Sequence, residues 1–141
     1  MQHLRITILA ALALIVASCH QRHSGNTIAP ETYRGMFPAA DCPGIDYTLT
    51  LNDSIAGVDT LFALRMVYIE GDNDGSDITF DSRGRQQRFG IGAKRGYRLT
   101  PDDGDVATYF AIVNDTTLQM VDSTLTAIES PFNYDLVRTN Q

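Results

Sequence analysis

The chain has 141 residues, a formal net charge of −6 and only two cysteines. This length suits one small domain behind a leader, and about 110 residues can bury a single hydrophobic core without staples. The acidic balance argues against nucleic acid, and against electrostatic binding to anionic lipid, as the partner of this protein.

The start of the chain has the pattern of a lipoprotein leader. Arg5 precedes a run from 6 to 17 in which every residue but Thr7 is apolar. That run suits the hydrophobic region of a secretory signal and is too short to span a bilayer, which takes about 20 residues. It ends in Val16-Ala17-Ser18-Cys19, which resembles the lipobox of bacterial lipoproteins. An ordinary secretory signal or an uncleaved anchor is the alternative.

The lipobox predicts that residues 1–18 are a signal peptide and that Cys19 is the lipidation site, carrying fatty acyl chains such as palmitate. Each buried methylene contributes about 0.8 kcal/mol, so a single chain binds marginally whereas two or more hold firmly. Residue 20 is His rather than Asp, which favours the outer membrane under the sorting rule of enteric bacteria. Residues 19–30 are then the lipidated cysteine and a flexible, polar tether.

From Glu31 onward, short apolar stretches alternate with turn sequences. The predicted strands are 47–51, 61–68, 78–80, 87–92, 97–99, 109–113, 118–121 and 132–136. Turn-forming residues separate them, notably at 71–75, 82–85 and 101–105. The stretch 61–68 could also be helical, but its length and its β-branched and aromatic end favour a strand.

About eight strands at a spacing of roughly ten residues, without a sustained helical period, predict an all-β fold. A meander of this kind has to hide its edge strands, and closing into a barrel does so. We expect a small antiparallel β-barrel of about eight strands over residues 31–141, with a two-sheet sandwich as the alternative.

The two ends of this region carry a family resemblance. The stretches 33–35, 37–45 and 48–51 open it, and 118–122 and 128–136 close it. They resemble the two ends of the N-terminal domain family of the copper-resistance and envelope-stress lipoprotein NlpE. The resemblance implies a lipocalin-like β-barrel held at the outer membrane and linked to envelope stress signalling, surface sensing and copper tolerance. Some members carry a second, C-terminal oligonucleotide-fold domain, whose roles are not expected of this sequence.

The opening turn of that family typically carries Cys-x-x-Cys, whereas here the first position is Ala39 and the second is Cys42. Two thiols at that spacing can form a disulfide or chelate a soft metal, and one thiol alone can do neither. With Cys19 taken by lipid, no structural disulfide is expected. We expect Cys42 to be a small buried residue that fixes the turn, with Pro43 and Gly44 setting its geometry.

Copper binding is not favoured by the other residues of the domain. Residues 31–141 contain no histidine, and Met36 is the one methionine near Cys42 in sequence. Met66 and Met120 fall in strand patterns and are expected to fill the core. No metal and no cofactor site is therefore predicted.

The sequence favours a non-enzymatic lipoprotein that acts through protein contacts. No histidine is present in the domain to activate a serine, and the acids fall in turns, so no catalytic constellation is predicted. The candidate partner-binding residues lie in the opening turn and the last strand, and the alternative is that they only close the barrel. They are Pro38, Asp41, Cys42, Pro43, Gly44, Asn133 and Tyr134. A second possible function is a lipocalin-like carrier of a small apolar ligand, for which an eight-stranded barrel is only just wide enough.

Overall fold

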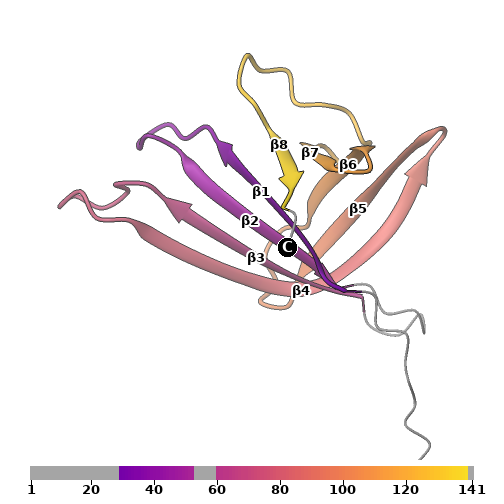
Figure 1. The fold of residues 1–141 in the computed structure, drawn as a ribbon, viewed down its shortest axis with the longest axis horizontal. Coiled ribbons are helices and arrows are strands. Elements are labelled where there is room, and N and C mark those ends of the chain that lie inside the picture. The colour runs from indigo at the N-terminus through magenta and orange to yellow at the C-terminus, as the bar shows by residue number, and fades with distance from the viewer. Residues whose placement is uncertain (1–28, 53–59, 140–141) are drawn as a thin grey trace, which may run out of the picture.

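The computed structural model describes residues 29–52 and 60–139 and forms a closed antiparallel barrel in which each strand pairs with its neighbours in the chain (Figure 1). The strands are β1 (Glu31–Phe37), β2 (Ile45–Asn52), β3 (Leu61–Tyr68), β4 (Ile78–Ile91), β5 (Lys94–Pro101), β6 (Thr108–Asn114), β7 (Thr117–Val121) and β8 (Asp135–Arg138). Pairing of β1 with β8 closes the barrel. The predicted all-β barrel is confirmed.

The predicted leader, Cys19 and residues 20–28 of the tether lie outside the described residues. Within the described part, no helix is long and apolar enough to cross a membrane.

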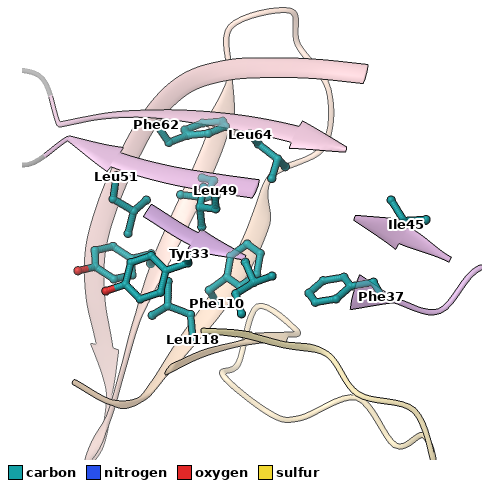
Figure 2. Packing of buried hydrophobic residues seen from close by; sticks show 12 residues of the cluster. Tyr33, Phe37, Ile45, Leu49, Leu51, Phe62, Leu64, Phe110 and Leu118 are labelled. Atoms are coloured by element: carbon teal, nitrogen blue, oxygen red, sulfur yellow. The ribbon is translucent and has the colours of Figure 1, made fainter. Parts of the chain in front are cut away.

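Alternation along the strands selects the side chains that fill the barrel. In β2, Leu49 and Leu51 are buried, whereas Thr48 and Thr50 keep contact with solvent. Leu49 lies opposite Leu64 of β3, so apolar side chains face each other across the strand pair. Six side chains are completely buried: Phe110, Leu49, Leu51, Leu99, Leu118 and Leu136. They fill the middle of the barrel (Figure 2).

The number of strands agrees with the prediction, but two errors offset each other. The sequence pattern omits β1, because its inward positions Tyr33 and Phe37 are separated by Gly35 and only two large apolar residues mark the strand. The turn predicted at 82–85 is wrong, since 78–80 and 87–92 belong to the single strand β4. Its first half pairs with β3 and its second half with β5.

The last strand also differs from the prediction. β8 begins at Asp135 rather than at residue 132, and Phe132 lies in the preceding connection with 63% of its surface exposed. Asn133 Oδ1 accepts a hydrogen bond from the Asp135 backbone N–H at 3.1 Å, a local turn that ends the connection before the strand starts.

Two glycines stand where neighbouring strands approach most closely. A Cβ atom on Gly84 would lie 2.2 Å from the Thr100 carbonyl oxygen, and one on Gly35 would lie 2.3 Å from the Asp135 carbonyl oxygen. Gly84 pairs with β3 on one side and with β5 on the other, so β4 bends there between its two partners. The residues that composition assigns to a turn therefore form a bend inside a continuous strand.

Because successive strands are antiparallel, their connections divide between two ends of the barrel. One end, here called the β1–β2 end, holds the connections 38–44, 69–77, 102–107 and 122–134. The other, here called the β4–β5 end, holds the start of β1 and the connections 92–93 and 115–116. In Figure 1 the β1–β2 and β3–β4 hairpins project to the left and the β4–β5 hairpin to the upper right.

The bend at Gly84 generates a stability prediction. Gly84→Ala should lower the free energy of unfolding by about 3 kcal/mol, because the added methyl group meets backbone atoms that can move only by distorting the strand pair. In the control Gly90→Ala, on the same strand, the nearest atom is a guanidinium nitrogen of Arg95 at the end of a flexible side chain. Its effect should stay below about 1 kcal/mol in urea unfolding. Equal losses in the two variants would contradict the assignment of the bend.

Candidate functional site

The opening turn between β1 and β2 is tied down from within and from the neighbouring connection. The Cys42 thiol donates a hydrogen bond to the Gly44 carbonyl oxygen at 3.3 Å. The same oxygen accepts a hydrogen bond from the Ile69 backbone N–H at 3.0 Å, at the start of the β3–β4 connection. A Cβ on Gly44 would lie 2.9 Å from the Met36 sulfur, so Gly44 leaves room for this side chain. The turn is thus held rigidly at the rim of the barrel.

The closing segment reaches the same place. The Tyr134 ring meets the Phe37 ring edge-on with centroids 5.6 Å apart, and Phe37 stacks on Tyr47 at 4.2 Å. The Tyr134 carbonyl oxygen accepts a hydrogen bond from the Met120 backbone N–H at 2.9 Å. The structure therefore brings together the opening turn and the closing segment, two regions that lie about ninety residues apart in the sequence.

The predicted contact residues differ in their exposure. Asp41, Pro43 and Asn133 are exposed at this end, and Pro38, Cys42 and Tyr134 are partly buried. Gly44 is buried and acts through the backbone contacts of the turn. The side chains that a partner could touch directly are therefore the exposed ones, with Tyr134 holding the closing segment in place behind them.

Three exposed apolar side chains at this end were missed by the sequence analysis. Phe132 precedes Asn133, Met36 is 53% exposed beside Gly44, and Phe80 is 51% exposed. Phe80 lies opposite Met66 and meets Tyr68 edge-on at 5.4 Å, on the part of the β3–β4 hairpin that projects from the barrel. Alternation assigns Phe80 to the interior, in phase with the buried Gly84 of the same strand, and only the projection of the hairpin leaves it partly open to solvent.

Cys42 is a free cysteine and is half-buried, so the expected full burial is met only in part. Its sulfur and the sulfur of Met36 both lie beside Gly44. No group of three or more His, Cys, Asp or Glu side chains in the described ranges is placed to hold a metal ion. Met66 and Met120 pack against the core, as predicted.

The β1–β2 end is strongly acidic. Its four connections contain ten acids and no lysine or arginine. These acids are Asp41, Glu70, Asp72, Asp74, Asp77, Asp102, Asp103, Asp105, Asp122 and Glu129. Hydrogen bonds from Ser76 lower the pKa of Asp74, and hydrogen bonds from Thr124 lower the pKa of Asp122. Both carboxylates thus stay ionised at neutral and mildly acidic pH.

A separate hollow of about 380 Å³ lies at the β4–β5 end. Glu31 on its wall accepts a hydrogen bond from the Tyr33 hydroxyl and pairs with Arg138, each at 2.7 Å. Burial, followed by the hydrogen bond to Glu31, raises the pKa of Tyr33 well above its usual range. Arg88 lies over the Tyr97 ring at 5.3 Å. The charged groups on the wall of this hollow do not favour an apolar ligand.

Comparison with known protein families finds a match. The model of the NlpE N-terminal domain family matches residues 33–131, which include seven of the eight strands in whole or in large part. No curated protein matches the chain, and no solved structure matches it.

The contact between Phe37 and Tyr134 predicts a measurable coupling. In a double-mutant cycle of Phe37→Leu and Tyr134→Leu, we expect a coupling of about 1 kcal/mol in the free energy of unfolding, because an edge-on aromatic pair stabilises beyond its buried area. The control cycle pairs Phe37→Leu with Phe89→Leu, whose ring instead contacts Tyr109. Additive effects in the first cycle would show that the closing segment is not fastened to the turn.

Proposed function

This chain belongs to the NlpE N-terminal domain family, and we propose that it is a non-enzymatic lipoprotein of the bacterial envelope that acts through protein contacts. The family and the barrel fold fit an envelope lipoprotein. The proposed role is sensing of envelope stress or of surface contact, with the β1–β2 end as the contact surface. The main observation behind the proposal is that the Tyr134 ring packs edge-on against Phe37 at the start of the opening turn, and that exposed apolar side chains lie at the same end of the barrel.

The direction in which the chain enters the barrel supports this assignment. The tether joins β1 at Glu31, whereas the opening turn follows Phe37 at the opposite end of the same strand. A strand of this length spans about 20 Å at roughly 3.3 Å per residue. With acyl chains on Cys19 as the proposed anchor in the outer membrane, the contact surface is separated from the point of attachment by the length of the barrel.

The chemistry of the surface indicates the kind of protein that fits it. The ten acids of the connections attract a cationic surface and accelerate encounter with it. Phe132 and Met36 offer apolar area that a partner would bury, and such anchors supply most of the binding energy in protein interfaces. We therefore propose a partner with a basic patch around an apolar pocket.

Copper tolerance, which the family resemblance implies, would depend on the same protein contacts in this proposal. Ala39 stands where the family has the first cysteine of Cys-x-x-Cys, and Cys42 donates its thiol hydrogen to the Gly44 carbonyl. One thiol and the neighbouring thioether of Met36 provide fewer soft ligands than a tight copper site uses.

The alternative carrier function is not favoured. Phe110, Leu49 and Leu118 are completely buried and occupy the middle of the barrel, where a small apolar ligand would have to sit (Figure 2). The hollow at the β4–β5 end is lined by charged side chains instead.

Site-specific photo-crosslinking in the producing cells tests the proposal. A photoreactive residue in place of Asp41 or of Asn133 should capture the same envelope protein, because the two positions lie on one surface. The matched control is Asp115, which is equally exposed but lies in the connection between β6 and β7 at the other end. Equal capture from Asp115, or different proteins from the two test positions, would contradict the assignment.

Two further arms complete this experiment. Tyr134→Ala should reduce the captured fraction at least tenfold, because loss of its ring frees the closing segment from the turn. Cys19→Ala tests the anchor: the protein should leave the membrane fraction, and retention equal to that of the original chain would refute the anchoring part of the proposal.

A further inference from the structure

The cations of this acidic protein are concentrated on one hairpin. The hairpin formed by β4 and β5 contains six cationic residues and a single acid, Asp81. The cations are Arg83, Arg85, Arg88, Lys94, Arg95 and Arg98, and all six are exposed. The net charge of −6 is therefore the sum of a basic hairpin and acidic connections, and it does not reveal that the two charges are separated.

Most of these cations have no ion pair with another residue in the described part of the chain. Among residues 29–52 and 60–139, the ion pairs within 4.0 Å use Arg34, Arg65 and Arg138 and none of the hairpin's own cations. Arg83 acts electrostatically on Asp81, and Lys94 acts on Asp122. Arg95 donates to two carbonyl oxygens of the turn, at 2.8 and 2.9 Å, and so keeps its charge at the hairpin tip.

The tip of the hairpin is amphipathic. Ile91 is 45% exposed, and it is followed by the exposed residues Gly92 and Ala93. Gly92 takes a positive φ of 59°, which lets the chain reverse within two residues. This short apolar tip lies directly beside Lys94 and Arg95. A segment that combines apolar and cationic side chains in this way binds preferentially at the interface between lipid headgroups and acyl chains.

The hairpin tip lies at the end of the barrel where the chain enters. By the order of the strands, the start of β1 and the 92–93 connection share this end, opposite the connections 38–44, 69–77 and 102–107 with eight of the ten acids. The 122–134 connection folds back toward the tip, where Val121 and Leu125 line one hollow with Lys94. Asp115, the paired Glu31 and Asp122, on which Lys94 acts, are the described acids near this end, and the residues 91–95 of the tip itself carry only positive charge. An anchored barrel with this charge distribution would turn its basic hairpin toward an anionic surface and its acidic end away from it.

We propose that the β4–β5 hairpin docks on the anionic headgroups of the membrane that anchors the chain, with Ile91 at the interface. The inference rests on the proposed lipid anchor, which would hold the hairpin within reach of the membrane. Cations near an anionic membrane strengthen binding by about fivefold each, an effect confined to roughly one Debye length. The hairpin then fixes the orientation of the barrel, and the β1–β2 end stays free for its partner.

The test uses the acylated full chain in vesicles, with Cys42→Ser and a fluorophore on Ala93→Cys at the hairpin tip. Quenching by headgroup-labelled lipid is compared between phosphatidylcholine vesicles and vesicles containing phosphatidylglycerol. We expect strong quenching only with phosphatidylglycerol, reversed by 0.5 M salt at a Debye length of roughly 4 Å. A label on Ala40→Cys, in the opening turn, should remain unquenched.

Charge variants make the test specific. Lys94→Gln/Arg95→Gln, at the tip, should lower the docking equilibrium about 25-fold, from about fivefold per cation, whereas Arg34→Gln/Arg65→Gln removes two exposed arginines outside the hairpin and should change it less than twofold. Equal quenching at the two labels, or no dependence on phosphatidylglycerol, would overturn the proposal. Quenching that rises with the number of protein molecules per vesicle, rather than with the phosphatidylglycerol content, would show that the hairpin binds the acidic end of a second copy. That result would also overturn the proposal. Failure to float with neutral vesicles would refute the anchor separately.

Discussion

The close approach of neighbouring strands at Gly35 and Gly84 is the constraint on which the rest of the structure depends. At Gly35 the backbone of β8 occupies the space of a side chain, and at Gly84 the backbone of β5 does so. These approaches allow eight short strands to close around a narrow core. The seam, that is, the junction of β1 with β8, is stabilised further by the Glu31–Arg138 ion pair and by the hydrogen bond from Thr139 N–H to the Thr32 carbonyl.

Closure also determines which parts of the sequence can act together. Acids that are scattered along the sequence gather at one end in the connections 38–44, 69–77 and 102–107, because every second connection of a meander lies there, whereas Asp122 lies within the influence of Lys94. The same rule places the start of β1 with the basic hairpin at the other end. The proposed contact surface and the proposed membrane-facing surface thus follow from a single topology. They have opposite charge, which would orient an anchored barrel without any further domain.

Strands whose inward positions are large and apolar could be predicted from the sequence. Leu49 and Leu51, or Tyr97 and Leu99, mark their strands clearly because both members of each pair are buried. β1 escaped prediction because an inward position is Gly35, where the space for a side chain is filled by another strand. The turn predicted at 82–85 is wrong for the same reason, because a glycine was again misinterpreted. Gly84 allows β4 to bend close to β5 and does not mark a chain reversal.

The candidate site could be predicted only in part. The opening turn and Tyr134 were found through a family resemblance, and the structure shows that Tyr134 contacts Phe37 at the foot of that turn. The exposure of Phe80 and Phe132 could not be predicted, because alternation reports which face a residue takes and not how far a hairpin extends beyond the barrel. Likewise, the cations of β4 and β5 are spread along the sequence, and strand pairing joins them into one surface.

Closure of the barrel between β1 and β8 can be tested directly by a disulfide across the seam. Arg34 and Val137 are register partners, so Arg34→Cys/Val137→Cys, combined with Cys42→Ser, should oxidise nearly completely in the envelope and leave the secondary structure unchanged. The control pair Arg34→Cys/Val113→Cys joins β1 to β6, which are not neighbours, and should keep free thiols. Free thiols in the seam pair, or oxidation only after unfolding, would contradict the closed barrel and the two-ended arrangement that depends on it.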